Sequence, residues 1–206
     1  MASRPPRTVV IACGAIAHEL VAVIKANRLD NIDIQCLPAE WHNTPTRIAP
    51  AVEQKIIAAH ANGARVLVAY GDCGTGGLLD KVLQKQGVER LPGEHCYSFF
   101  AGASVFDTLA EDELGTFYLT DYLVDNFNRL ILDGLGITRY PELKEQYFAH
   151  YTRLMYLMQD EVSERVPHRR LAAQRAADAL GLPLQIHKTG LQPFEYSLRN
   201  ISIVAA

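Results

Sequence analysis

Four cysteines, arranged as two pairs of equal spacing, constrain the fold of this 206-residue chain more than any other feature. Cys36 lies 23 residues after Cys13, and Cys96 lies 23 residues after Cys73. Cys13 and Cys73 each end a short apolar run, and each is followed at once by glycine and then by a helix-like stretch. Short apolar runs of this kind are typical of buried parallel strands. The repeat therefore predicts two related strand–turn–helix–strand units, each with a thiol where its first strand ends.

Strand-like and helix-like segments alternate along the whole chain. This alternation predicts an α/β fold, a parallel sheet covered by helices on both faces and built from pseudo-repeated units. The segment 93–99 fits either a fourth strand or an extended loop, and 122–135 has the pattern of one amphipathic helix. We expect a single domain over residues 1–206, with repeat units at about 8–60 and 65–102 and a looser third unit at 115–206.

The repeated thiols predict a metal site. In an open parallel sheet, ligands bind beyond the carboxyl ends of the strands. In the strand order 2-1-3-4, Cys13 and Cys73 occupy neighbouring strand ends about 4.8 Å apart, close enough for both to bind one ion. Cys96 follows a Pro-Gly turn and is the expected third ligand, while His42 is expected as a fourth ligand or an acid–base group. Cys36 lies within an apolar strand pattern, so we expect a buried thiol that serves only packing.

Thiolate and imidazole ligands suit zinc, and three cysteines also suit iron or an iron–sulfur cluster with one exposed iron. The prediction of a metal site requires that the cysteines are reduced. The apolar run before Cys13 is only about five residues, whereas a secretory signal needs roughly 7–15. We therefore expect a cytoplasmic protein in which free cysteines favour metal or catalytic roles over disulfides.

A glycine-rich segment surrounds the second strand-end thiol. Its residues Gly74, Thr75, Gly76 and Gly77 can turn backbone N–H groups toward one anion, so we expect a carboxylate or phosphate of the substrate there. A tight strand-to-helix turn explains the same glycines equally well. Asp72 is a candidate general base, a partner for His42, or a helix cap, and the sequence does not rank these roles.

Two further positions repeat the pattern at 72–75 in the looser third unit. Thr120 and Asp121 follow an apolar strand, as Asp72 does, and are candidates for contact with the same substrate. Helix capping is the competing interpretation for both residues.

Composition excludes several classes of partner. The net charge is −3 and the pI is near 6.2, which gives no electrostatic reason to expect nucleic-acid binding. No window approaches the roughly 18 apolar residues that a membrane span requires. The aromatic residues Tyr97, Phe99 and Phe100 belong either to the core or to a subunit interface, so a homo-oligomer is one expectation.

Several short strings occur together in this chain: Ala12-Cys13-Gly14-Ala15, Leu37-Pro38-Ala39 with His42-Asn43, Tyr70-Gly-Asp-Cys-Gly-Thr-Gly-Gly77, His95-Cys96-Tyr97 with Ala101-Gly102, and Gly115-Thr-Phe-Tyr-Leu-Thr-Asp121. Together they resemble a widespread prokaryotic family known as a domain of unknown function, over nearly the whole chain. The family pattern includes the positions of Cys13, His42, Cys73 and Cys96. Its members are often encoded beside corrinoid-dependent methyltransferases. The resemblance thus implies one-carbon metabolism, with a corrinoid methyltransferase system as partner and corrinoid or tetrahydrofolate in the pathway.

The sequence leads to one main hypothesis and two rivals. The main hypothesis is a metal-dependent enzyme that acts on a small anionic or methylated metabolite by lyase, hydrolase or methyltransferase-type chemistry. The first rival is a corrinoid-, pterin- or metal-binding accessory protein without turnover. The second is a thiol redox protein in which Cys13 and Cys73 form a reversible disulfide.

Overall fold

The computed structural model describes residues 7–200 of the chain and has an α/β architecture with two small parallel sheets flanked by helices. The predicted fold class is therefore confirmed. The chain divides into two compact units: the second unit comprises Phe100–Phe194, and the first contains the remaining described residues. Each unit has its own three-stranded sheet, whereas the sequence suggested one larger sheet.

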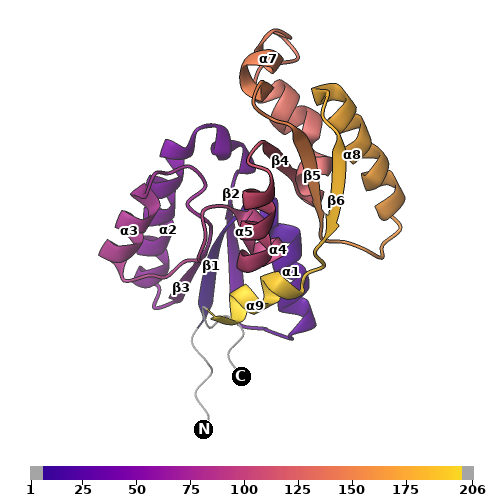
Figure 1. Cartoon of the computed structure of the whole chain (residues 1–206). Helices are drawn as coiled ribbons and strands as arrows, with labels where there is room; N and C mark the ends of the chain where they lie inside the picture. Colours follow the sequence, from indigo (N-terminus) through magenta and orange to yellow (C-terminus); the bar gives the residue numbers. More distant parts are fainter. Residues whose placement is uncertain (1–6, 201–206) are drawn as a thin grey trace. The chain divides into compact units, whose positions relative to one another are not determined.

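The first unit carries all four cysteines. Its elements are β1 (Thr8–Cys13), α1 (Ala17–Ala26), β2 (Ile32–Leu37), α2 (Ile48–Ala61), β3 (Arg65–Ala69) and α3 (Leu78–Gln86), with 3-10 turns at Gly14–Ile16, Ala39–Asn43 and Pro45–Arg47. The first part of α4 (Cys96–Ala101) and most of α9 (Gln192–Asn200) also belong to it. The strand order is β2-β1-β3, all parallel. Because parallel crossovers are right-handed and the two here run in opposite directions, α1 and α2 cover opposite faces of the sheet (Figure 1).

The strand order places the ends of β1 and β3 side by side. Ala12 pairs with Ala69 and also with Cys36 on the other side. The expected fourth strand position is reduced to a single bridge between Val68 and Arg90. The segment 93–99 is neither a strand nor wholly a loop, because helix α4 begins at Cys96. Pro92 and Gly93 disfavour a long strand, and the apolar residues after Cys96 are buried as a helix instead.

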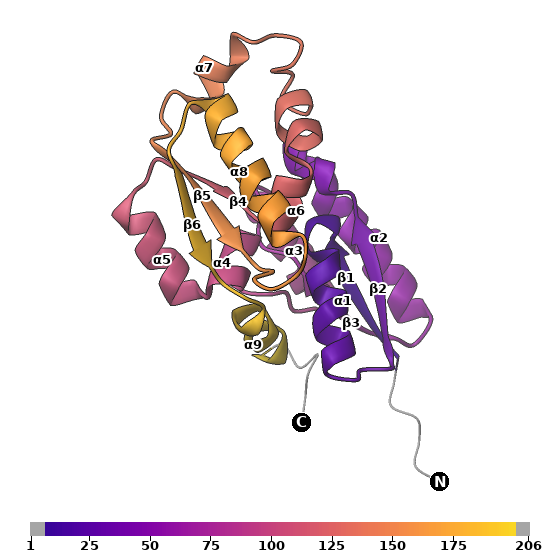
Figure 2. The same cartoon turned by 90° about the vertical axis from the view of Figure 1, so that its right-hand side faces the viewer.

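The second unit contains α5 (Ala103–Asp112), β4 (Thr116–Leu119), α6 (Asp121–Asp125), a π-helix (Asn128–Asp133), α7 (Leu143–Phe148), β5 (Arg153–Met158), α8 (Val166–Leu180) and β6 (Leu184–Lys188). The strand order is β4-β5-β6, all parallel. Helices α6 and α8 contact each other and lie on one face of the sheet (Figure 2). The expected continuous helix over 122–135 is instead divided between α6 and the π-helix.

Alternation along the strands explains how the second sheet is covered on both faces. Leu119, Leu154 and Tyr156 point into the apolar cluster that α8 completes with Ala173 and Ala177. Side chains on the opposite face meet α5: the ring of Tyr118 contacts Phe106, and Arg153 donates a hydrogen bond to the Leu109 carbonyl. Successive strand residues face opposite sides, so both faces of this sheet are occupied.

Candidate thiol site

The first thiol of the candidate site lies where β1 ends. Cys13 is buried, and its sulfur accepts a hydrogen bond from the Ala15 N–H at 3.3 Å, which caps the 3-10 turn at Gly14–Ile16. Burial raises the pKa of the Cys13 thiol from 9.0 to about 11, although the Ala15 N–H and the Tyr70 hydroxyl both act to lower it. Cys13 is therefore a neutral thiol near pH 7 in the absence of a cation.

The second thiol follows β3 and has an unusual backbone. Cys73 is buried and has a φ of +50°, a left-handed backbone conformation that residues other than glycine seldom adopt. Its N–H donates to the Glu94 carbonyl at 2.8 Å. A Cβ at Gly71 would lie 2.9 Å from the same carbonyl oxygen, so only glycine permits this approach. The chain around Glu94 is thereby held against the end of β3, just before Cys96.

The third thiol is the first residue of α4. Cys96 is half-buried. Burial, followed by the negative charges of Cys73, Cys13 and Glu19, raises the pKa of Cys96 well above its ordinary value. The charges of the other two predicted sulfur ligands thus disfavour the thiolate of Cys96. Glu19 on α1 has a buried carboxylate oxygen, and its negative charge is one of those that act on Cys96.

His42 joins the thiols from the 3-10 turn at Ala39–Asn43. Its Nδ1 lies 2.8 Å from the Ala39 carbonyl oxygen and 4.0 Å from the Cys13 sulfur. Because a carbonyl only accepts, Nδ1 carries the proton and the Nε2 lone pair is left available. Burial acts to lower the pKa of His42, but the hydrogen bond and the charge of Cys73 and the Ala39 carbonyl outweigh it, so the pKa is raised. We call Cys13, His42, Cys73 and Cys96 the thiol site.

Tyr70 is a residue of this site that the sequence interpretation missed. It directly follows β3, its side chain is buried, and its ring stacks on that of His42 with centroids 6.4 Å apart and planes 14° apart. Burial, and then the charge and the hydrogen bond of Cys13, raise the pKa of the Tyr70 phenol above its ordinary value. Its position in the sequence, directly before Gly71-Asp72-Cys73, could have indicated its place in the site. A residue at the end of a strand lies at the same edge of the sheet as the thiol that follows it.

The glycine-rich loop is occupied by its own carboxylate. Asp72 accepts hydrogen bonds from the Thr75 hydroxyl at 2.5 Å and from the N–H groups of Gly76 and Gly77 at 3.0 and 2.9 Å. Burial acts to raise the pKa of Asp72, but these hydrogen bonds and the charge of Arg90 prevail and lower it. Asp72 thus acts as a cap before α3. The N–H groups at 76 and 77, two expected donors to a substrate anion, already have a partner.

Thr120 and Asp121 lie in the second unit. The Thr120 hydroxyl caps α6 by accepting from the Leu123 N–H at 3.3 Å. The Asp121 carboxylate is buried and accepts from the Tyr156 hydroxyl at 2.8 Å and from Arg169 at 2.6 Å. These contacts give both residues structural roles within the second unit. Their assignment to a substrate remains a prediction.

The expectation of a buried Cys36 is wrong, because this residue is exposed. It lies on β2, which is an edge strand of the first sheet, and five of the six residues of this strand are not buried. An apolar strand pattern does not reveal which strand lies at an edge, and that distinction decides the exposure of Cys36.

The residue types of the thiol site suit a metal ion, but their side chains are not arranged around a common point. Across residues 7–200, no group of three or more His, Cys, Asp or Glu side chains is already arranged to hold a metal ion. Three thiols and one imidazole nevertheless form a donor set typical of zinc and iron. In a metal site of this kind the ligand atoms lie about 2.0–2.3 Å from the ion.

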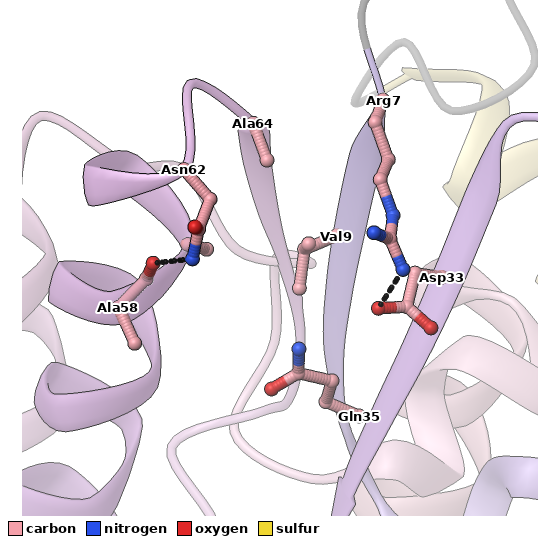
Figure 3. Close-up of a pocket in the computed structure, with 8 residues that line it drawn as sticks. Arg7, Val9, Asp33, Gln35, Ala58, Asn62 and Ala64 are labelled. Atoms are coloured by element: carbon pink, nitrogen blue, oxygen red, sulfur yellow. Dashed lines mark hydrogen bonds and ion pairs between the residues drawn. The ribbon is translucent and has the colours of Figure 1, made fainter.

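A hollow of about 330 Å³ lies at the other end of the first sheet and contains none of the thiols. It is lined by residues at the starts of β1 and β2 and at the end of α2, including Arg7, Asp33, Gln35 and Asn62 (Figure 3). Arg7 and Asp33 form an ion pair of 3.0 Å there, and both side chains are exposed. Ligands of open parallel sheets bind at the opposite, carboxyl edge, which favours the thiol site.

This chain belongs to the family described as Protein of unknown function (DUF1638), whose model matches residues 36–198. The matched range contains His42, Cys73 and Cys96 and begins after Cys13. No curated protein and no solved structure matches the chain significantly. None of the helices described between residues 7 and 200 is long and apolar enough to cross a membrane.

Proposed function

We propose that this protein is a metal-dependent enzyme whose thiol site holds zinc or iron, either as a single ion or as an iron–sulfur cluster. Cys13, Cys73 and Cys96 would be the ligands. The observation that carries the proposal is geometric. Strands β1 and β3 pair up to Ala12 and Ala69, just before Cys13 and the loop that holds Cys73, and the Cys73 N–H donates to the carbonyl of Glu94, two residues before Cys96.

A cation removes the cost that these thiols otherwise impose on one another. Thiolates gathered in a buried region are unfavourable because of lost hydration and mutual repulsion. A bound divalent ion reverses this balance, so that coordinating thiols lose their protons outright. The three thiols that repel one another as thiolates would therefore each be stabilised by a bound cation. Glu19 adds negative charge to the same region.

His42 has the features of a metal ligand or an acid–base group. Ligating histidines almost always donate their other N–H to a carbonyl or carboxylate, and Ala39 supplies such a carbonyl. The same bond leaves Nε2 free to bind an ion or to accept a proton from a substrate.

The reaction is proposed in its class only. A thiolate-bound zinc or iron with an open position supplies a Lewis acid that polarises a small substrate. The substrate is proposed to be a small anionic or methylated metabolite. The family resemblance supports a place in one-carbon metabolism beside a corrinoid-dependent methyltransferase.

Metal analysis with matched cysteine variants tests the proposal. Protein purified without oxygen should contain about one zinc or iron ion per chain, or about four irons if a cluster is bound. The variants C13A, C73A and C96A should lose most of this metal. C36A, which removes the exposed cysteine of the same unit, should retain it. Less than about 0.2 metal per chain in the wild type, unchanged in the three site variants, would overturn the proposal.

A further inference from the structure

A second hollow, of about 370 Å³, lies in the second unit between helix α8 and the segment that joins α6 to the π-helix. Helices α6 and α8 contact each other and lie side by side (Figure 2). Three alanines of α8, at positions 172, 176 and 179, line one wall, and their short side chains leave the space between the helices open. All the lining residues belong to the second unit, so the hollow is formed without any residue of the thiol site.

Arg175 of α8 lines this hollow and has no bound partner. Its side chain is exposed, and its guanidinium makes no hydrogen bond or ion pair within the described residues 7–200. Arg169 of the same helix is different, because it pairs with Asp121, Asp125 and Asp160. A guanidinium has five N–H donors in a planar fork that matches an oxyanion. Arg175 therefore offers this fork to a molecule that enters the hollow.

A second arginine lines the hollow from the other side. Arg129 lies in the π-helix, and it donates to the Tyr122 hydroxyl at 3.3 Å and to the Asn126 side-chain oxygen at 3.0 Å. Both acceptors are uncharged, so these two bonds orient the guanidinium without offsetting its charge. A π-helix is rare in proteins and often occurs at a functional site. This one begins at Asn128, which also lines the hollow and adds an amide group.

The charges around the hollow favour an anion. Asp125 is the one acidic residue that lines it in the described part of the chain. The Asp125 carboxylate accepts from the Arg169 guanidinium at 2.7 and 3.1 Å, so its charge is already offset. The charges of Arg129 and Arg175 therefore dominate the lining, and a hollow lined by one sign of charge raises the local concentration of ions of the opposite sign.

We propose that this hollow is a binding site distinct from the thiol site, and that it holds the phosphate or carboxylate group of a small ligand between Arg129 and Arg175. Guanidinium groups bind both kinds of oxyanion through paired, charge-assisted hydrogen bonds. The two arginines come from different elements of one packed unit, so they hold the group from two sides. The proposal needs no metal, and its failure would leave the proposed function of the thiol site untouched.

NMR titration of the ¹⁵N-labelled full-length chain tests the inference. Sodium phosphate and sodium acetate are added separately at constant ionic strength, with sodium chloride as the reference salt. We expect at least one of the two anions to cause saturable shifts at residues 124–129 and 172–179 that chloride does not cause. R175Q and R129Q should each weaken this binding about ten-fold or more. R175K should weaken it less, because lysine keeps the charge but loses the paired donors.

The matched control is R170Q, which removes another exposed arginine of α8 that does not line the hollow. R170Q should bind as the wild type does. The proposal is overturned if neither anion causes saturable shifts in the wild type, or if chloride causes the same ones. Equal weakening in R175Q and R170Q would overturn it too, because the arginines would then act only through net charge. The amide spectrum of each variant reports its fold, and if R175Q is misfolded, R175K and R129Q decide by the same comparison.

Discussion

The carboxylate of Asp72 accepts the N–H of Gly77 at 2.9 Å, five residues further along the chain. The strand-to-helix loop therefore closes around its own anion. Gly76 and Gly77 have φ values of +62° and +78°, and this left-handed backbone turns their N–H groups back toward Asp72. The two glycines therefore serve this internal cap.

Replacing Asp72 with asparagine should destabilise the first unit. One carboxylate oxygen becomes an N–H₂ donor that faces backbone N–H donors, so we expect D72N to lose about 1–3 kcal/mol of unfolding free energy at pH 7. The pKa of Asp72 is lowered in the folded state, so its stabilisation is present above pH 3.8 and is lost as the pH falls through the folded pKa. Urea denaturation at several pH values measures this. Asp30, an exposed residue of the same unit, gives the control D30N, and an equal effect of both variants would contradict the cap.

The contact between His42 and Cys73 should be visible in the titration of the imidazole. Burial alone would lower the pKa of His42, and Cys73 is the main reason that it is raised instead. We therefore expect C73A to lower the pKa of His42, measured by NMR on metal-free protein. C36A should leave it unchanged, because Cys36 is exposed on the edge strand. An unchanged pKa in C73A would show that the two side chains do not interact in solution.

The residues of the thiol site illustrate what sequence patterns can predict. The positions of Cys13 and Cys73 near neighbouring strand ends were predictable, because apolar runs show where strands end and parallel strands bring their ends to one edge. Cys36 was mispredicted because edge and central strands share the same pattern. Tyr70 was missed because a tyrosine at a strand end faces the site only through three-dimensional packing. The division into two sheets was equally hidden, because every strand–helix repeat looks alike along the chain.

The stability of the metal-free protein should fall steeply at high pH because of Cys13. Its folded pKa of about 11 lies above the ordinary value of 9.0, so the folded state keeps a proton that the unfolded state loses. The resulting stabilisation is complete below pH 9 and is lost as the pH rises through 11, for a total of up to about 3 kcal/mol. Chemical denaturation with reductant and chelator should show a smaller loss for C13A over this range. Parallel curves for the two proteins would refute the buried thiol.

Adding a methyl group at Gly71 should separate Cys73 from Cys96. The new Cβ would lie 2.9 Å from the Glu94 carbonyl oxygen, and backbone cannot yield as a flexible side chain does. We expect G71A to cost about 1–3 kcal/mol and to reduce metal content together with stability. Gly134, with a right-handed φ of −63°, provides the control G134A, which should be tolerated. Normal stability and full metal content in G71A would mean that the close approach does not hold the site together.

The buried carboxylate of Asp121 should be more important for stability than the neighbouring Asp125. Both bind Arg169, at 2.6 and 2.7 Å, but the Asp121 side chain is 2% exposed and that of Asp125 is 29% exposed. Asp121 also accepts from the Tyr156 hydroxyl and the Gln159 N–H. Arg169 keeps its ion pair with Asp125 in D121N, but the new N–H₂ group would face buried hydrogen-bond donors, so D121N should cost about 2–3 kcal/mol. D125N should cost about 1 kcal/mol, because solvent partly replaces the lost contact. Thermal and urea unfolding measure the difference. If D121N remains stable but alters ligand binding, Asp121 serves a substrate rather than the fold, as its position after a strand first suggested.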